Sequence, residues 1–373
     1  MKEYNAIVIG LGAVGSAALY FLSKSMPQVM GIDRFDPPHA MGSSHGETRI
    51  TRLAVGEGQE YVKLARRSQE IWKLMEQESS EKLFCQVGGI LLDSGLQPWS
   101  KYGGSSFFDT TCKIAQSENI RHEILNGVSI RNRYPAFVVS DQSRGYVEPS
   151  AGYVFPDRII RTQLELAEKN GAKIRINQPV QAIRQNNGWV EVELTQERIR
   201  ARYVVISVGG WIKDFAAKEE IKKFKICRQV LHWVAVEKGS PMADQNSVFM
   251  WGYGPSPTDF LYGFPSMDGE TLKIASEQFE DVGHPDSIQR LVSQAEKDLF
   301  WEEKLRGKFE GLLPKIEKSE VCFYTLTPDA KFVILNHPQM NQVKMVSACS
   351  GHGFKHASAL GEELAGELLA SFG

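Results

Sequence analysis

Two short stretches of the chain collect side chains that could act on a ligand, and the first lies near the C-terminus. Residues 347–358 read SACSGHGFKHAS, with Cys349 three residues before His352 and six before Lys355. A thiol beside a histidine and a lysine could be a nucleophile with its base. The alternative is a tight glycine turn whose chemistry lies in its backbone.

The second stretch, residues 43–52, reads SSHGETRITR and is rich in cations. Arg49 and Arg52 are three residues apart, so on a helical turn they would share a face and form an anion site. The planar fork of a guanidinium group suits a carboxylate or the electron-rich edge of a flavin. The alternative is a solvated basic turn that Glu47 and Glu57 neutralise.

The N-terminal segment has a pattern that would position a dinucleotide. It predicts a strand, a helix and a second strand, at residues 6–9, 13–22 and 28–33. Gly10, Gly12 and Gly15 form a GxGxxG turn before the helix, and Asp33 ends the second strand. In such a turn backbone amides approach a pyrophosphate at the helix N-terminus, while the acidic side chain binds ribose hydroxyls. The motif predicts a dinucleotide without choosing between NAD and FAD.

The rest of the pattern places both reactive stretches at the ends of strands. Helices are predicted at 60–78, 158–169 and 287–300, and strands at 84–93 and 181–208. The segment VKMVSACSG is a buried type of strand that turns at glycines into a helix from 357 to 368. No Pro/Gly-rich linker divides the chain, so we expect an α/β fold of two interleaved domains.

The composition narrows the class of partner. Of 373 residues, 42% are hydrophobic and 24% are charged, and the formal net charge is −2. These values favour a globular protein with a small-molecule ligand over one that binds nucleic acid or a membrane. The five cysteines lack CxxC spacing, which argues against disulfides and a zinc site, and glycines interrupt the N-terminal apolar run, which argues against a signal peptide. We therefore expect a cytoplasmic protein without a metal ion.

Five motifs carry a resemblance to a known family: GLGAVG, FDPPHAMGSSHGETRITRLAVGEG, YGFPS, VCFYTLTPD and SGHGFKHAS. In this order they resemble the monomeric sarcosine oxidase and N-methyltryptophan oxidase family, FAD-dependent amine oxidases of the D-amino acid oxidase superfamily. The resemblance runs from Ile7 to Leu369 and implies a monomer. It implies a Rossmann-like FAD-binding domain at 1–82, 146–220 and 321–373, interleaved with a mixed β-sheet substrate domain at 83–145 and 221–320.

The resemblance also implies residue roles. Cys322 would join FAD covalently through its sulfur, although from the residues alone it would be a small core side chain. Lys273 would face the flavin and promote the reduction of O2, because a fixed ammonium group stabilises the negative charge that forms on oxygen. Arg52 and Lys355 would hold the carboxylate of the substrate.

Other residues complete the predicted site. His45, Arg49 and Tyr324 join Lys273 as catalytic residues, and Tyr262 contacts the substrate. The cofactor site is predicted to contain Gly10, Gly12, Ala13, Val14, Gly15, Asp33, Arg34, Ser43, Ser44, Thr48, Arg49, Val180, Gly209, Trp211, Cys322, Gly351, His352, Gly353, Phe354 and Lys355.

Glu277 departs from the family pattern. The sarcosine-oxidising members have a histidine at this position, four residues after the lysine. A carboxylate there would repel a simple monocarboxylate substrate or would bind a second cationic group. The resemblance also makes Cys349 a strand residue without a chemical role and leaves His356 unassigned.

The implied reaction oxidises a secondary, N-methyl amino acid to an imine, which hydrolyses to an aldehyde and a primary amine, while O2 is reduced to hydrogen peroxide. One alternative is an NAD-dependent dehydrogenase, which leaves VCFYT and SGHGFK unexplained. A second is a flavin-dependent amino acid or 2-hydroxy acid dehydrogenase with another electron acceptor. A third is a non-catalytic flavin-binding protein.

Overall fold

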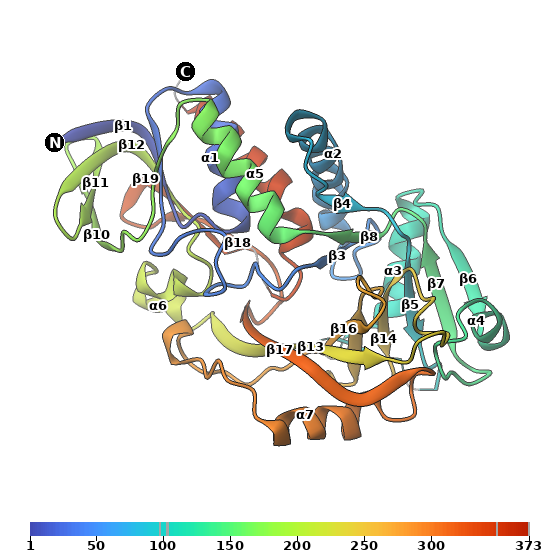
Figure 1. The fold of residues 1–373 in the computed structure, drawn as a ribbon. Coiled ribbons are helices and arrows are strands. Elements are labelled where there is room, and N and C mark those ends of the chain that lie inside the picture. Colours follow the sequence, from blue (N-terminus) through green and yellow to red (C-terminus); the bar gives the residue numbers. More distant parts are fainter. Residues whose placement is uncertain (97, 102–103, 348–349, 372–373) are drawn as a thin grey trace.

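The computed structural model describes residues 1–96, 98–101, 104–347 and 350–371, which form two large sheets and one small sheet (Figure 1). The first large sheet has the order β10-β11-β12-β1-β2-β9, with β19 beside β12 and β18 beside β19. Its strands are β1 Lys2–Ile9, β2 Val29–Ile32, β9 Lys173–Arg175, β10 Val180–Asn186, β11 Trp189–Leu194, β12 Arg198–Ile206, β18 Val333–His337 and β19 Met340–Ser347.

Strand β1 lies at the centre of this sheet and pairs in parallel with β2 and β12. The chain leaves β1 at Gly10, which has φ +85°, and enters helix α1, Ala13–Ser25. A Cβ atom on Gly15 would lie 1.8 Å from the carbonyl oxygen of Gly10. Only glycine fits at Gly15, since any side chain there would push the helix away from the strand. The predicted strand, helix and strand are all present.

The two faces of β1 belong to different cores. Ala6 and Val8 pack with the helices, whereas Ile7 and Ile9 pack against the strands that cross the other face. The helices on the first face lie side by side in Figure 1 and are α1, α5 Pro156–Lys169 and α8 Ala357–Ala370. Helix α2, Val62–Ser79, joins them through a hydrogen bond from Trp72 Nε1 to Ser358 Oγ at 2.8 Å.

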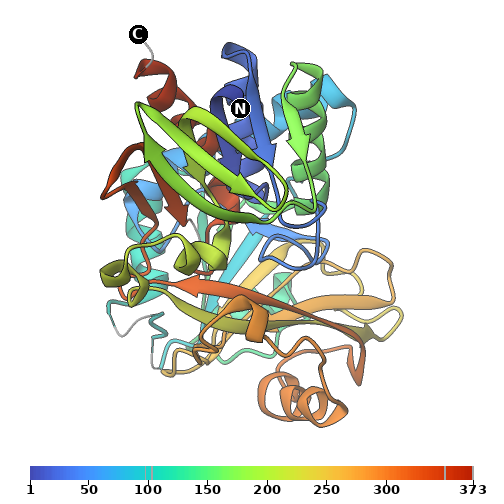
Figure 2. The same ribbon diagram turned by 90° about the vertical axis from the view of Figure 1, so that its left-hand side faces the viewer.

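The second large sheet forms the other layer of the molecule, below the first in Figure 2. Its order is β17-β13-β16-β15-β14-β5-β7-β6. The strands are β5 Gly89–Asp93, β6 Glu123–Asn126, β7 Arg144–Glu148, β13 Lys225–Val236, β14 Val248–Gly252, β15 Phe260–Gly263, β16 Thr271–Ser276 and β17 Leu312–Leu326. The predicted α/β fold class is confirmed.

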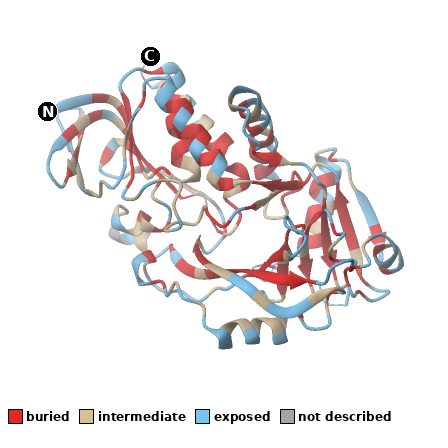
Figure 3. Ribbon diagram, in the orientation of Figure 1, coloured by how far each residue is buried: buried red, intermediate tan, exposed pale blue. Residues whose placement is uncertain are grey.

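The register of this sheet fixes two pairs of residues that matter below. Cys322 and Tyr324 are two residues apart on β17, so their side chains leave the same face. Lys273 on β16 and Glu277, directly after it, are four residues apart and share a face for the same reason. Figure 3 shows that β13 and the middle of the sheet are buried, while helix α7 is largely exposed.

The small sheet connects the two layers and has the order β3-β8-β4. Its strands are β3 Arg49–Thr51, β8 Gly152–Val154 and β4 Phe84–Cys85. The helical turn expected around Arg49 and Arg52 is therefore wrong, because antiparallel pairing with β8 holds this segment in an extended conformation.

The remaining helices are short. They are α3 Phe107–Ser117, α4 Gly127–Arg133, α6 Lys218–Ile221 and α7 Gln294–Phe300, with short 3₁₀ turns at Gln59–Tyr61, Gly209–Asp214, Pro285–Ser287 and Phe354–His356 and a π-helical turn at Trp301–Leu305.

The helix predicted at 287–300 is shorter than expected and begins at Gln294. Ser293 caps it, since its side chain accepts a hydrogen bond from the Glu296 amide. Upstream, Arg228 donates to the carbonyl oxygens of Gln289 and Leu291, which holds that segment outside the helix.

The division of the chain into five domain segments stays a prediction. The first sheet takes its strands from 1–82, 146–220 and 321–373, and most of the second comes from 83–145 and 221–320. Strands β7 and β17 each run across one of the predicted bounds.

Candidate active site

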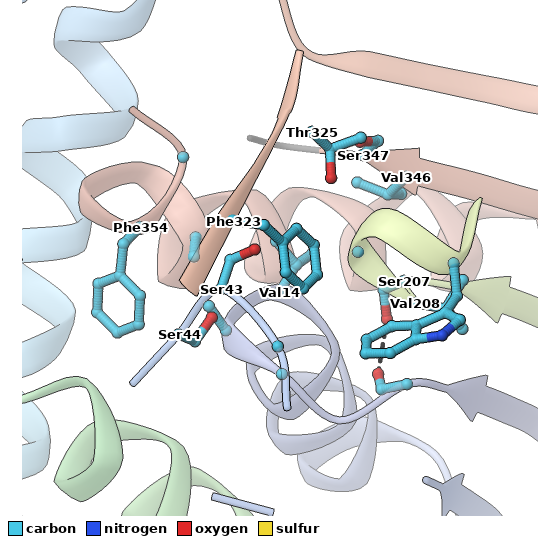
Figure 4. Close-up of a pocket in the computed structure, with 18 of the residues that line it drawn as sticks. Val14, Ser43, Ser44, Ser207, Val208, Phe323, Thr325, Val346, Ser347 and Phe354 are labelled. Carbon is cyan, nitrogen blue, oxygen red and sulfur yellow. Dashed lines mark hydrogen bonds between the residues drawn. The ribbon is translucent and has the colours of Figure 1, made fainter. Parts of the chain in front are cut away.

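A cavity of about 1100 Å³ lies where the two layers meet, and both contribute to its lining. The predicted site residues that line it are Gly10, Gly12, Ala13, Val14, Asp33, Arg34, Ser43, Ser44, Arg49, Arg52, Val180, Gly209, Trp211, Tyr262, Glu277, Cys322, Tyr324, Gly351, His352, Gly353, Phe354 and Lys355. Four others, Gly15, His45, Thr48 and Lys273, lie outside this lining. Figure 4 shows part of the cavity, with Val14, Ser43, Ser44, Ser207 and Phe354 among the labelled side chains.

The end of the cavity at α1 fits a dinucleotide. A Cβ atom on Gly12 would meet only the Ser44 hydroxyl, at 4.0 Å, so open space lies directly above the turn. The first amides of α1 have no partner within the helix and face this space, which suits a pyrophosphate. Asp33 is held in place by the amides of Leu11 and Phe35, at 2.7 and 2.8 Å. The residues present therefore fit FAD.

Lys273 is turned toward the backbone of the 43–52 stretch rather than into the cavity. Its ammonium group donates to the Gly46 carbonyl, to the Thr48 carbonyl at 2.8 Å and to the Thr48 hydroxyl at 3.1 Å. Burial and the nearby Arg49 lower its pKa well below the usual value. The three acceptors match the three donors of an ammonium group, which favours the charged form. The side-chain nitrogen of Lys273 thus lies near Arg49 and outside the cavity lining.

His45 and Arg49 are fixed by their own neighbours. Arg49 donates to the carbonyl oxygens of Thr48 and Ser43, at 2.9 and 2.8 Å. His45 Nδ1 lies 3.6 Å from Glu320, while burial lowers the pKa of its ring. Within the described residues, His45 Nε2 is buried without a hydrogen-bond partner.

Arg52 and Lys355 come together around an internal carboxylate. Arg52 is 4% exposed, and its guanidinium lies 2.9 Å from Glu57. Lys355 Nζ lies 3.8 Å from the same carboxylate and donates to the His352 carbonyl at 3.1 Å. The interpretation of Arg52 as part of a solvated basic turn is therefore wrong, although its pairing with Glu57 is correct. Glu47 instead pairs with Lys318 at 3.1 Å.

The pKa values of this group reflect burial and mutual charge. Burial opposes ionisation of Glu57, but the cations of Lys355 and Arg52 hold its pKa well below the usual range. Burial lowers the pKa of Lys355 to about 7, and Glu57 partly offsets this shift. The two cations and the carboxylate therefore form one coupled group of charges.

Glu277 points into the same cavity and pairs with a residue that the sequence analysis did not find. Lys101 Nζ lies 2.8 Å from Glu277 Oε1, and both side chains are buried. No local motif marks Lys101, which approaches from a loop 176 residues away along the chain. Beside this pair, the hydroxyls of Tyr262 and Tyr324 lie 3.4 Å apart.

Arg52, Glu57, Lys101, Glu277 and Lys355 are named the charged cluster below. They are electrostatically coupled. Lys101 helps to lower the pKa of Glu57, whereas burial raises the pKa of Glu277 and the cations of Lys101 and Lys355 oppose that rise. The Arg52 guanidinium also lies over the ring of Phe107, with 5.2 Å to the ring centroid.

The described part of the C-terminal stretch, residues 350–356, lies just before α8. Gly351 has φ +77°, and a Cβ atom there would lie 2.7 Å from the ring of Tyr324, so the backbone passes close to this side chain. His352 Nε2 bonds to the Ala330 carbonyl at 2.9 Å, and burial lowers its pKa to about 3. The predicted strand position of Cys349 lies outside the described residues.

His356, left unassigned by the sequence, packs in an aromatic cluster. Its ring lies 5.4 Å from that of Tyr61 and 5.3 Å from that of Phe332, measured between centroids. The side chain is fully buried, and burial lowers its pKa well below the usual value. Its lowered pKa favours a neutral imidazole, and among the described residues neither ring nitrogen has a hydrogen-bond partner.

Comparison with known proteins gives the chain a family. The family described as FAD dependent oxidoreductase matches residues 5–367. Monomeric sarcosine oxidase from Bacillus sp. (strain NS-129) is 33% identical over 368 residues, covering 97% of this chain and 92% of the relative. N-methyl-L-tryptophan oxidase from Yersinia pestis (strain Pestoides F) is 33% identical over 369 residues, covering 96% and 93%.

Solved structures show the same fold at low sequence identity. NikD, described as an unusual amino acid oxidase essential for nikkomycin biosynthesis, has a TM-score of 0.82 and 18% identity, covering 100% of this chain and 95% of that one. Amadoriase I, a fructosyl amine:oxygen oxidoreductase from Aspergillus fumigatus, has a TM-score of 0.70 and 16% identity, covering 99% and 87%.

The chain belongs to the FAD dependent oxidoreductase family, and FAD is its cofactor. The predicted resemblance and the predicted enzyme class, an FAD-dependent amine oxidoreductase, are confirmed. The choice between NAD and FAD that the glycine motif left open is settled in favour of FAD.

The described residues include neither a helix suited to span a membrane nor a cluster suited to bind a metal ion. None of their helices combines the length and the apolar character needed to cross a bilayer. Among the same residues, no group of three or more His, Cys, Asp or Glu side chains is arranged to hold a metal ion.

Proposed function

We propose that this protein is a monomeric, cytoplasmic oxidase of secondary amino acids that forms an imine and reduces O2 to hydrogen peroxide. The imine then hydrolyses to an aldehyde and a primary amine. When bound, FAD would supply the two-electron redox chemistry that couples oxidation of the amine to reduction of O2. The relatives named for sarcosine and N-methyl-L-tryptophan support this substrate class.

The observation that carries the proposal is the buried anion site formed by Arg52 and Lys355. Two cations inside a cavity need a negative partner, because a buried uncompensated charge is costly. Glu57 supplies one negative charge against these two cations. We infer that the carboxylate of the substrate binds Arg52 and Lys355 beside Glu57, offsets the remaining positive charge and fixes the C–N bond for oxidation.

Cys322 is our candidate for the covalent link to FAD. It lines the cavity, is 2% exposed and sits on β17 two residues before Tyr324, whose hydroxyl also faces the cavity. Its strand β17 lies at the edge of the sheet and is paired with β13 from Lys225 to Val236, which would hold the attached ring in a fixed orientation.

Lys273 is our candidate for the group that promotes the reduction of O2. Transfer of electrons to oxygen creates negative charge, and a fixed ammonium group stabilises that charge without reorganising. Its bonds to the Gly46 and Thr48 carbonyls hold the side-chain nitrogen near Arg49, whose own side chain lines the cavity.

A substrate panel tests this function. The purified holoenzyme is given sarcosine, N-methyltryptophan, glycine and lactate in air, and hydrogen peroxide and the carbonyl product are quantified. We expect peroxide with at least one secondary amino acid and none with lactate. Turnover only with an artificial electron acceptor would favour a dehydrogenase, and lack of flavin reduction by every compound would favour a non-catalytic flavoprotein.

A further inference from the structure

Glu277 has one carboxylate oxygen that nothing in the described chain satisfies. Oε1 pairs with Lys101, but Oε2 is buried and has no hydrogen-bond partner. The side chain is 3% exposed and lines the cavity. A buried acceptor without a donor is costly, so its retention points to a ligand group that donates to it.

The position of Glu277 is set by the sheet rather than by a mobile loop. It follows β16 directly and shares a strand face with Lys273, and β16 is paired on both sides, with β13 and β15. Its carboxylate is close enough to Lys355 for that cation to influence its pKa. The unsatisfied oxygen therefore lies within the charged cluster, beside the site proposed for the substrate carboxylate.

The chemical nature of the donor follows from Lys101. An ammonium group on the ligand would gain from Glu277 but would be repelled by Lys101, whose Nζ is only 2.8 Å from Oε1. A second carboxylate would be attracted to Lys101 and repelled by Glu277. A hydroxyl group satisfies both neighbours, since it donates to the carboxylate and accepts from an ammonium group.

The charge balance of the charged cluster also favours an uncharged hydroxyl group as the donor. Its three cations, Arg52, Lys101 and Lys355, exceed its two carboxylates, Glu57 and Glu277, by one. One ligand carboxylate neutralises this excess when the reacting amine is uncharged. Any further charged group on the ligand would leave a net buried charge, which is unfavourable.

We propose that the substrate is a secondary amino acid with a hydroxyl group on its N-substituent or its side chain, bound by Glu277 Oε2 and Lys101. This inference rests on the proposed function and narrows its substrate class. Glu277 and Lys101 are then specificity-determining residues. Simple N-alkyl amino acids leave Oε2 without a donor and are poorer substrates.

Matched substrate pairs test the proposal. N-(2-hydroxyethyl)glycine is compared with N-propylglycine, and N-methylserine with N-methyl-2-aminobutyrate, so that each pair exchanges a hydroxyl for a methyl group. The 1-amino-1-deoxyketose derived from glycine is included as a polyhydroxylated probe. We expect kcat/KM to favour the hydroxylated member of at least one pair by about 10- to 100-fold, the range for a hydrogen bond to a charged group. Ratios within about threefold in both pairs would overturn the inference.

A binding measurement separates this inference from the proposed function. (2-Hydroxyethoxy)acetate and propoxyacetate have an ether oxygen in place of the amine, so neither can be oxidised as an amine. Their dissociation constants on the FAD-loaded protein are measured by calorimetry. Tighter binding of the hydroxylated ether supports the inference even if no amine is oxidised. Equal binding of the two ethers contradicts it even if secondary amines are oxidised.

Variants test whether Glu277 and Lys101 cause the preference for hydroxylated substrates. Glu277→Gln should reduce the preference for hydroxyl to about threefold or less, whereas Glu303→Gln, an exposed residue outside the cavity, should leave it unchanged. Because Glu277→Gln leaves Lys101 buried without its partner, the double variant Glu277→Leu with Lys101→Met is made as well. It removes both charges together and should reverse the preference toward the alkyl members. A hydroxyl preference that persists in the double variant would exclude the pair as its source.

Discussion

Lys355 makes carboxylate binding depend on pH, and the direction follows from its surroundings. Burial lowers the pKa of Lys355 to about 7. Below this pH its ammonium group adds to the charge of Arg52, and above it the charge is lost, so affinity for a carboxylate should fall as pH rises through 7. If only the cation binds, the dissociation constant rises by about tenfold per pH unit, or roughly 100-fold between pH 6 and 9.

Propoxyacetate is a suitable probe, because its carboxylate stays ionised over this range and it has no amine to titrate. Its dissociation constant is measured by calorimetry on the FAD-loaded enzyme in buffers of different ionisation enthalpy. Bound carboxylate stabilises the cationic form of Lys355, so binding above pH 7 should take up about one proton.

Two variants test whether Lys355 causes the pH dependence of carboxylate binding. Lys355→Met should bind propoxyacetate weakly and without the pH dependence, whereas Lys113→Met, at an exposed position on α3, should keep the wild-type profile. A constant affinity from pH 6 to 9 in the wild type, or an unchanged slope in Lys355→Met, would refute the reasoning.

Three further predictions concern the cofactor and its reaction. Precipitation with acid should leave wild-type protein yellow, while Cys322→Ser should release its flavin into the supernatant; a colourless wild-type pellet would exclude the covalent link. Lys273→Met should slow flavin reoxidation by about 100-fold in stopped-flow experiments and change flavin reduction by less than about threefold, and equal losses in both steps would count against its role. Gly15→Ala would force a Cβ atom to 1.8 Å from the Gly10 carbonyl, so we expect a cost of about 3 kcal/mol, seen as a lower melting temperature and a lower FAD content. Wild-type values for both quantities would show that the turn relaxes freely.

The parts of the site that the sequence predicted are those fixed by local backbone chemistry. Gly10, Gly15 and Asp33 lie within one strand-turn-helix-strand unit, where the need for glycine is visible in the spacing alone. Cys322 was different, because its residue type and neighbours indicate only a core position, and the resemblance alone suggested a role.

The parts that the sequence missed depend on contacts between distant segments. Lys101 meets Glu277 across 176 residues of chain, so no local pattern could pair them. Arg49 and Arg52 were expected on one face of a helical turn, but pairing of β3 with β8 extends the chain there. The anion site still forms, with Lys355 as the second cation and Glu57 between them.

The central claim is that buried cations present a secondary amino acid to FAD, which then passes the electrons to O2. The most direct test adds one equivalent of the best secondary amino acid to the holoenzyme without oxygen and then admits oxygen. We predict complete loss of the oxidised flavin spectrum in the first step. Recovery of that spectrum should follow, with one hydrogen peroxide and one primary amine per flavin. A flavin that stays oxidised in the first step, or recovers without peroxide, would contradict the account.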